Sequence, residues 1–467
     1  MIRLFNQYVA LKSVLLVALE SVIVTLSLIG AASLRFWGHP SQFQSMVLVP
    51  FFAVKALVVV ITIQMCCYYN NLYDFHTFRR RQEELIGLGQ SEGQACVLLG
   101  LLYFAVPDLM LGRGILLIAV LLAGPLIAAC RAALDSSWSN TALKQNVLIL
   151  GSGDLAGALA CQFTSRADLN LCIVGFLQAG RDPEHPASLA GYKLLGEMKD
   201  LTSAVRNEGV DKIIVALDER RQVLPVHELV RLRMEGIVVE DAQTAMTALS
   251  GRVMLDTVQP IWFVFSRGFR RSTIMLAVKR FLDIVCATLG LILTAPIMAL
   301  TAVVIVLDSG WPVFYQQRRV GLGKRCFNIL KFRSMTNNAE GDGARWASAG
   351  DQRVTRVGRF LRKYRLDEFP QFINVLRGDM SFVGPRPERP EFVEQLRKEI
   401  LYYDERHTVR PGITGWAQVQ YDYGGSVEAA YRKLEYDLFY LQNMSAIFDI
   451  MIIVQSVRTV LSGKGGR

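Results

Sequence analysis

The sequence has no Cys-x-x-Cys pair, although it contains 8 cysteines. Several of them lie in apolar runs: Cys66, Cys67, Cys130 and Cys286. Zinc sites and disulfide frameworks place cysteines at characteristic spacings, so we interpret these thiols as reduced residues of a core or a membrane segment. A signal-peptide cleavage pattern is also absent, and the first apolar run is therefore expected to remain in the protein.

Charged residues are scarce, at 20%, whereas apolar residues reach 52%. The mean hydropathy of +0.29 is too high for an ordinary soluble enzyme, yet the charged residues require water-facing parts. A net charge of +10 suits nucleic acid, anionic lipid or an anionic small substrate. Long apolar runs favour the last two, and no nucleic-acid-binding motif is recognisable. We expect a membrane protein with soluble domains; a membrane-tethered DNA-binding protein is the weaker alternative.

Four apolar stretches fill the first third of the chain, at 13–34, 46–68, 91–109 and 113–133. A spanning helix needs about 20 apolar residues, so each stretch predicts one. The second connection carries Arg79, Arg80 and Arg81, and basic loops lie in the cytoplasm. Both ends of this four-helix unit are expected to face the cytoplasm; a buried bundle in a soluble protein is the alternative.

An α/β pattern follows, with strands predicted at 146–150, 172–177, 212–217 and 236–240 and helical runs between them. This alternation predicts a parallel, Rossmann-like sheet. Gly151, Gly153 and Ala156 match a dinucleotide fingerprint. The second strand ends at Gln178 rather than at the acidic residue that would bind a ribose. A degenerate Rossmann scaffold is therefore favoured over a bound nucleotide.

A fifth apolar run covers 284–307 and contains Pro296. Lysine and arginine outnumber aspartate and glutamate in the part of the chain that follows, so a spanning helix would put a basic region outside the cytoplasm, against the charge rule. A helix that kinks at Pro296 and returns to the same side avoids this conflict. We predict such a re-entrant helix, with a fifth spanning helix as the alternative.

The C-terminal part carries many basic residues between short apolar pieces. Phosphate binding requires such a set, because the planar fork of arginine pairs with phosphate oxygens two at a time. The set comprises Arg318, Arg319, Lys331, Arg333, Arg359, Arg362, Lys363, Arg365, Arg386 and Arg410.

Within this basic region stands one acidic pair, Asp367 and Glu368. Pro370 and the apolar spacing up to Gly378 predict a helix that begins here. Acidic residues at a helix start can be simple caps. Among many arginines, however, a carboxylate can also attack phosphorus, or hold Mg²⁺ together with substrate phosphates.

Two rigid loops follow, Val383-Gly384-Pro385-Arg386-Pro387 and Arg410-Pro411-Gly412-Ile413-Thr414-Gly415-Trp416. Proline lowers the entropy of an open loop, and proline with glycine forms turns. Helices are predicted at 427–442 and 446–461, the second with Ser445 as its N-cap and Gly463 as its end.

Together these segments resemble the bacterial sugar transferases, which are polyprenyl-phosphate hexose-1-phosphate transferases that initiate exopolysaccharide and O-antigen synthesis. The likeness covers about 275–467. It rests on Lys279-Arg280-Phe281-x-Asp283, Gln317-Arg318-Arg319-Val320-Gly321, Lys331-Phe332-Arg333-Ser334-Met335, Leu366-Asp367-Glu368-x-Pro370-Gln371, Gly378-Asp379-Met380-Ser381 and the two rigid loops. The front of the chain is similar to the N-terminal extension of the family's larger members.

The resemblance implies that Asp367 attacks the β-phosphate of a UDP-sugar and expels UMP, and that Glu368 assists with Mg²⁺ or a proton. The sugar-phosphate would then pass to undecaprenyl phosphate. Arg362 would hold phosphate and Arg386 the nucleotide sugar, with Lys331, Arg333 and Arg410 as further phosphate-binding candidates. The sugar is expected to be glucose or galactose. The family's re-entrant helix breaks at Ser-Pro, whereas this chain has Ala295-Pro296.

These expectations combine into three parts: a four-helix transmembrane region at 1–140, a degenerate Rossmann-like domain at 141–265, and an α-rich monotopic catalytic domain at 266–467. We expect a multi-pass protein of the bacterial inner membrane, a homodimer, with its catalytic domain in the cytoplasm. One alternative is a membrane-bound nucleotide-sugar dehydratase, whose Tyr-x-x-x-Lys spacing occurs only from Tyr8 to Lys12. An inactive assembly or regulatory protein is the other.

Overall fold

The computed structural model describes residues 2–4, 7–9, 11–47, 50–70, 72–73, 81–138, 145–165, 171–178, 191–217, 224–256, 258, 260–266, 268–269, 271–336, 351–421, 424 and 426–461. Basic residues 79 and 80 and the predicted helix end at Gly463 lie outside these ranges. The chain forms two compact units, Met1–Ala245 and Met246–Arg467. The predicted domain boundaries at 140/141 and 265/266 stay predictions.

Four long apolar helices follow a small antiparallel pair, β1 (Ile2–Leu4) and β2 (Gln7–Val9). They are α1 (Leu11–Arg35), α3 (Pro50–Tyr69), α4 (Arg81–Ala105) and α5 (Arg113–Trp138), with the short α2 (Pro40–Val47) and η1 (Pro107–Leu109) between them. All four are long and apolar enough to cross a membrane. The predicted helices are confirmed, but the third begins at Arg81 rather than at 91, because a more polar stretch extends it.

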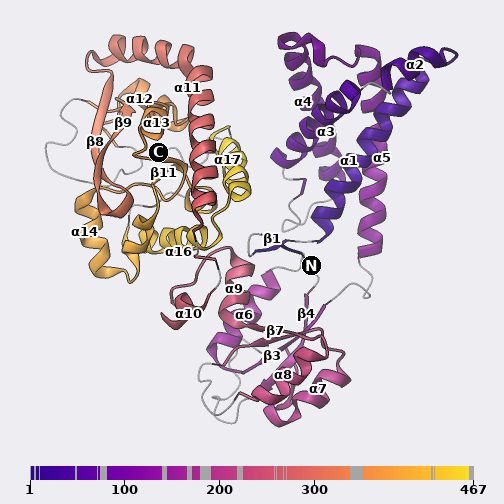
Figure 1. Cartoon of the computed structure of the whole chain (residues 1–467), viewed down its shortest axis with the longest axis vertical. Helices are drawn as coiled ribbons and strands as arrows, with labels where there is room; N and C mark the ends of the chain where they lie inside the picture. Colours follow the sequence, from indigo (N-terminus) through magenta and orange to yellow (C-terminus); the bar gives the residue numbers. More distant parts are fainter. Residues whose placement is uncertain are drawn as a thin grey trace. The chain divides into compact units, whose positions relative to one another are not determined.

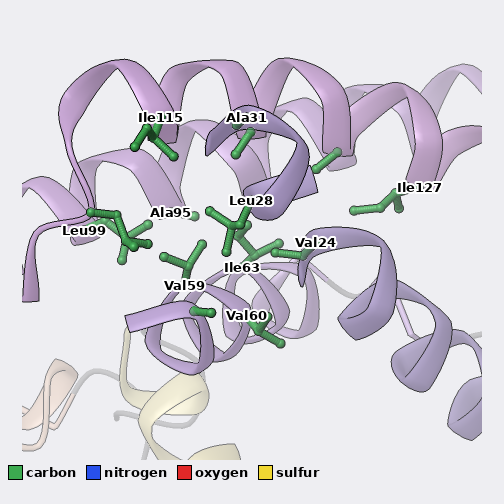
Figure 2. Close-up of a cluster of buried hydrophobic side chains, with 14 of the residues drawn as sticks. Val24, Leu28, Ala31, Val59, Val60, Ile63, Ala95, Leu99, Ile115 and Ile127 are labelled. Carbon is green, nitrogen blue, oxygen red and sulfur yellow. The ribbon is translucent and has the colours of Figure 1, made fainter. Parts of the chain in front are cut away.

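Small and branched apolar side chains form the core of this bundle (Figure 2). Leu28, Ile63, Leu99 and Ile127 come from four different helices and are at least 97% buried. Most other large apolar side chains of these helices are exposed, such as Leu26, Phe104 and Leu121. An apolar exterior around an apolar core is the pattern of a bundle whose solvent is lipid.

Arg131 joins the four helices at one buried point. Its Nε donates to Glu20 Oε1 of α1 at 2.7 Å, and its Nη1 donates to Glu84 Oε1 of α4 at 3.1 Å. The same Nη1 donates to the carbonyl of Leu72, just beyond α3, and the guanidinium lies over the Tyr73 ring. Tyr73 in turn donates its hydroxyl to Glu20 Oε2 at 2.6 Å. A buried charge inside a membrane bundle requires such partners.

A parallel five-stranded sheet follows in the order β5-β4-β3-β6-β7, as predicted for a Rossmann-like fold. Its strands are β3 (Gln145–Leu150), β4 (Leu171–Gln178), β5 (Leu194–Glu197), β6 (Lys212–Val215) and β7 (Val238–Asp241). Figure 1 shows α6 (Asp154–Ser165) on one face and α7 (Leu201–Asn207, after η5 at Met198–Asp200) and α8 (Val226–Met234) on the other. The sequence missed β5, which has only four residues and no alternating pattern.

The second unit begins within α9 (Ala242–Ser250) and continues through α10 (Pro260–Phe265) into α11 (Thr273–Ser309). The segment after α9 packs on the C-terminal α16 (Val427–Asn443). Val253 N donates to Glu435 O, Leu255 N donates to Glu435 Oε1, and Arg252 pairs with the same carboxylate at 2.9 Å. These residues therefore belong structurally with the C-terminal helices.

The remaining elements form a mixed, mainly helical unit. They are β8 (Phe314–Val320), η6 (Leu322–Lys324), β9 (Cys326–Phe332), α12 (Arg356–Lys363), η7 (Leu366–Glu368), α13 (Gln371–Arg377), β10 (Ser381–Val383), α14 (Pro390–Glu399), η8 (Tyr403–Thr408), β11 (Gly412–Thr414), α15 (Trp416–Gln420), α16 and α17 (Ala446–Leu461). The last two helices match the prediction, and Ser445 Oγ accepts Phe448 N as the expected cap.

The long helix α11 is tied to this unit at both ends. Near its start, Arg280 Nη1 donates to Val375 O at 2.7 Å, and near its end Ser309 Oγ accepts Arg333 Nη2 at 2.9 Å. The two anchor points are close together, because Asn374, beside Val375, accepts the amide of Leu330 on β9. A straight helix would separate Arg280 from Ser309 by about 44 Å, at about 1.5 Å per residue.

A sharp bend reconciles these contacts, and Figure 1 shows it in α11. Pro296 lies inside the helix, and proline removes a backbone hydrogen bond and kinks helices. Only 11% of the most apolar window of α11 is buried. Its exposed side chains include Phe281, Leu289, Ile292, Leu293, Leu300, Val303 and Leu307. The helix thus presents an apolar surface to its surroundings while both ends stay on the same domain.

Candidate active site

The hairpin of β8 and β9 forms one wall of the site. The two strands pair antiparallel from Phe314–Phe332 to Val320–Cys326, and Lys331 lies on β9. Asn374 of α13 fixes the hairpin: its Oδ1 accepts Leu330 N at 2.9 Å and its Nδ2 donates to Asn328 O at 2.8 Å. Lys331 is thereby held beside the segment that carries the acidic pair.

That segment runs from α12 through η7 into α13. Thr355 caps α12 by accepting Gly358 N, and Gly358 permits a close approach, since a Cβ there would lie 2.0 Å from Ser334 O. Arg365 then adopts a left-handed conformation with φ of 53°, which non-glycine residues adopt rarely and which concentrates at functional sites. This turn starts η7, and Asp367 and Glu368 occupy it just before α13. The predicted helix start and its end at Gly378 are confirmed.

Glu368 is the centre of a buried charge cluster. Its Oε1 accepts Lys331 Nζ at 3.0 Å and Arg386 Nη2 at 2.7 Å, and its Oε2 lies 3.8 Å from Arg365 Nη1. Burial alone would raise the pKa of Glu368, but the positive charges of Arg386 and Lys331 hold it well below its usual range. Glu368 is therefore ionised throughout the physiological range.

Asp367 has the opposite tendency. It is 7% exposed, and burial raises its pKa, with Lys331 acting against this and the ionised Glu368 adding to it. Its carboxylate makes no hydrogen bond to any residue in the described part of the chain. The pair thus consists of one carboxylate fixed as an anion and a neighbour whose proton affinity is increased, which is how environment divides roles between two acids.

Arg386 enters this cluster from a loop in which two distant turns pack backbone against backbone. The parallel pair β10–β11 aligns Ser381 with Gly412 and Val383 with Thr414. A Cβ on Gly412 would lie 2.1 Å from Gly384 N, and one on Gly415 would lie 2.2 Å from Gly384 O. Only glycine allows this approach. The two rigid loops of the sequence are therefore one structural unit that carries Arg386.

The structure gathers Lys331, Asp367, Glu368 and Arg386 in one place, with the Arg362 charge acting on Asp367. Arg333 and Arg410 make other contacts. Arg333 is 6% exposed and donates to the carbonyls of Trp311 and Gly310, beyond the end of α11. Arg410 Nε donates to Gly378 O at 3.0 Å. Both guanidinium groups thus donate to backbone carbonyls. Phosphate binding by Arg333 and Arg410 stays a prediction.

The sequence alone assigned no individual role to three residues that lie in or beside this site. Arg365 sets the turn before the pair, and Arg406 donates to the carbonyl of Arg386. Gln371 follows Asp367 by four residues, is 2% exposed, and its Nε2 has no hydrogen-bond partner among the described residues. The sequence offered a signal for Arg365, which belongs to the basic set, and for Gln371, which stands in the motif around Asp367.

The sequence of this chain was compared with known protein families and proteins, and it matches one family in the region of the site. Residues 274–463 match a family described as bacterial sugar transferase. The chain is 32% identical over 340 residues to a UDP-glucose:undecaprenyl-phosphate glucose-1-phosphate transferase of Escherichia coli, which covers 71% of this chain and 72% of that protein. The chain belongs to the bacterial sugar transferase family. The site described above lies wholly within the region that defines this family.

Other relatives of the sugar transferase family differ in the sugar that they are named for. The chain is 44% identical over 239 residues to a UDP-N-acetylgalactosamine-undecaprenyl-phosphate N-acetylgalactosaminephosphotransferase of Aeromonas hydrophila, covering 51% of this chain and 56% of that protein. It is 34% identical over 326 residues to an undecaprenyl-phosphate glucose phosphotransferase of Komagataeibacter xylinus, covering 68% and 59%. The matched region thus spans less than two thirds of these two relatives.

Residues 68–232 match a family described as a CoA-binding domain. In a Rossmann-like domain the turn between the first strand and the first helix, here β3 and α6, would hold the phosphates of such a cofactor. A Cβ on Gly151 would lie 2.3 Å from Ala216 O, so this glycine serves close packing against the end of β6. The turn Gly151-Ser152-Gly153-Asp154 holds no basic residue and places a carboxylate at the first position of α6. These residues do not fit the phosphates of CoA.

Proposed function

We propose that this sugar transferase moves a hexose-1-phosphate from a UDP-sugar to undecaprenyl phosphate and releases UMP. The observation that carries the proposal is the buried pair Asp367–Glu368, held among Lys331, Arg386 and Arg365. An anionic nucleophile surrounded by cations is what transfer of a negatively charged phosphoryl group requires. The names of the relatives support the same donor and acceptor classes.

In the first step a carboxylate oxygen of Asp367 attacks the β-phosphorus. The bond from this phosphorus to the oxygen shared with the α-phosphate breaks, and UMP leaves with that electron pair. The enzyme then holds the sugar-phosphate as an acyl phosphate. In the second step a phosphate oxygen of the lipid attacks the same phosphorus, and Asp367 leaves as a carboxylate. Glu368 stays ionised and keeps Lys331 and Arg386 directed at the phosphates.

Mg²⁺ fits this site by the chemistry of its donors. Two adjacent carboxylates together with substrate phosphates are a common magnesium environment, and Asp367 and Glu368 would supply them. When bound, the ion would neutralise charge on the diphosphate. Among the described residues no group of three or more carboxylate, histidine or cysteine ligands exists, so substrate oxygens would have to complete the coordination.

We place the catalytic unit on the cytoplasmic face of the bacterial inner membrane, with α11 as a re-entrant helix. Its exposed apolar side chains and its two anchored ends support this. A lipid acceptor enters from the bilayer, so a site fixed to a membrane-embedded helix can receive its phosphate without extracting the chain. The homodimer stays a prediction.

Release of UMP from a panel of UDP-sugars tests the function. Detergent-solubilised enzyme with Mg²⁺ and undecaprenyl phosphate is given UDP-glucose, UDP-galactose or UDP-N-acetylgalactosamine. We expect release with one or two of them, glucose foremost, loss on chelation, and loss in Asp367→Asn with an unchanged unfolding temperature. Folded wild-type enzyme that releases no UMP from any donor would contradict the proposal, and normal turnover by Asp367→Asn would remove Asp367 as the nucleophile.

A further inference from the structure

The side chain of Arg386 contributes to the site only if its backbone is held still. Arg386 lies between Pro385 and Pro387, which have no amide hydrogen to donate. The loop can therefore be fixed mainly through its carbonyls and through Gly384 N, which donates to Thr414 O at 2.9 Å. The groups that bind these carbonyls decide where the Arg386 guanidinium points.

Arg406 binds the carbonyl of Arg386 itself. Its Nη2 donates to Arg386 O at 2.9 Å, while its Nε donates to Asp437 Oδ2 at 3.1 Å and its Nη1 to Tyr403 Oη at 2.8 Å. All three nitrogens of the planar guanidinium thus donate hydrogen bonds. Asp437 lies on α16, so the fork of Arg406 connects this helix to the loop that carries Arg386.

The ion pair of Arg406 and Asp437 is deeply buried, at 5% and 2% exposure. Removing two charges from water is costly, and an apolar pair of similar volume is often as stable. Stability alone is therefore a weak reason for this pair. Its geometry offers a better one, because a planar fork held by a carboxylate aims its remaining donor in a fixed direction.

A second arginine, on β8, donates to the next carbonyl of the loop that carries Arg386. Arg319 of β8 donates through Nη1 to Pro387 O at 3.0 Å, and Val320 N donates to Glu388 O at 2.9 Å. Successive carbonyls of the loop are thus bound from β8 and from η8. With the backbone fixed on both sides, the Arg386 side chain reaches Glu368 Oε1 at 2.7 Å.

We propose that Arg406, held by Asp437, is a positioning residue that fixes the backbone of Arg386 and so directs its guanidinium to Glu368 and the bound diphosphate. The inference rests on the proposed function for its kinetic consequence. Its structural content, the immobilised loop, can be measured without any turnover.

The experiment compares Arg406→Lys with Arg252→Lys in the full-length enzyme. Lysine keeps the charge opposite Asp437 but cannot bind the carboxylate, Tyr403 and the carbonyl together. Arg252 is the matched control, because it pairs with Glu435 on the same helix and is not part of the loop contacts. Hydrogen–deuterium exchange of the peptide over 383–389 should become at least several times faster in Arg406→Lys and stay unchanged in Arg252→Lys.

Kinetics then tests whether Arg406 acts through Arg386. We expect Arg406→Lys to lower kcat/KM for the UDP-sugar about tenfold in the wild-type background, and less than twofold in an Arg386→Lys background, because coupled residues are not additive. Unchanged exchange at 383–389 would overturn the proposal whether or not the enzyme is active. Fully multiplicative losses in the double variant would also overturn it, since they would show that Arg406 acts elsewhere.

Discussion

At the scale of single residues, the pair Asp367–Glu368 sets the pH dependence. The attacking form of Asp367 is its anion, and burial raises its pKa. We therefore expect kcat/KM to rise with pH through the pKa of Asp367, at higher pH than an ordinary aspartate would give. In Glu368→Gln a neighbouring negative charge is lost, so the acid limb of the residual activity should move to lower pH.

The substrates titrate in the same way with the wild-type enzyme and with Glu368→Gln. A difference between the two pH profiles therefore comes from groups of the protein. Asp404→Asn, a change outside the cluster, serves as the control and should leave the acid limb in place. An acid limb that does not move in Glu368→Gln would show that it reports a substrate group rather than Asp367.

His407 gives a prediction about stability. Burial, with the adjacent Arg406 charge, lowers its pKa to about 4, so the folded protein binds this proton less readily than the unfolded chain does. The stabilisation is complete above about pH 6.5 and is lost as pH falls toward 4, by up to about 3 kcal/mol. The unfolding temperature should therefore change less between these two pH values in His407→Gln than in the wild-type protein. His227 is exposed, and His227→Gln serves as the control for replacing a histidine at the surface.

The roles of single arginines were the least predictable part of the site. The sequence showed that the region is basic and placed Asp367 and Glu368 at a helix start, as found. It could not divide arginines that face the acidic pair, such as Arg386, from Arg333, which binds carbonyls beyond α11. Charge is visible in a sequence, whereas the partner of each charge depends on contacts between residues far apart in the chain.

At the scale of elements, periodicity decided what could be predicted. The long apolar helices, the buried strands β3 and β4, and α16 and α17 carry clear patterns and were located from the sequence. The pair β10–β11 has three residues in each strand, and α14 and η8 lie between the two parallel strands in the chain. Strands this short contain no periodic pattern, so only their glycines and prolines were visible, as turns.

The packing of α12 against Ser334 yields a prediction for Gly358→Ala. The added Cβ would lie 2.0 Å from a backbone carbonyl, so α12 must shift and carry Arg362 and η7 with it. We expect a loss of about 1 to 3 kcal/mol in stability and a lower kcat/KM. Gly100→Ala in α4 is the control, because its Cβ meets nothing within 4 Å. Equal effects of the two changes on turnover would refute the argument.

At the scale of the whole molecule, native cysteines can report how α11 meets the membrane. Cys161 and Cys172 precede α11 and Cys326 follows it, and all three are exposed. Variants that retain one of these thiols are treated with a membrane-impermeant maleimide in intact spheroplasts and in open vesicles. A re-entrant helix predicts protection in spheroplasts and labelling in open vesicles for all three. Labelling of Cys326 alone in spheroplasts would establish a fifth spanning helix.

The four-helix bundle provides the second prediction at this scale. Arg131→Met would leave the buried carboxylate of Glu20 and the half-buried carboxylate of Glu84 without their cation, and removing one partner of a buried ion pair typically costs about 3 to 5 kcal/mol. We expect a lower temperature of unfolding in detergent, and partial recovery when Glu20→Gln is added. If the double variant is no more stable than Arg131→Met, the cluster is not the origin of the loss.

The contact between Glu20 and Arg131 also has a consequence for how the bundle assembles during synthesis. Glu20 and Arg131 stand 111 residues apart in the chain, and a ribosome adding about 5 to 20 residues per second needs about 6 to 22 s to travel between them. During that interval the first helix leaves the ribosome before Arg131, the residue that pairs with Glu20 in the folded bundle, has been made. The counter-charge of Glu20 arrives only with the fourth helix. The bundle can therefore complete this buried contact only after the fourth helix has been synthesised.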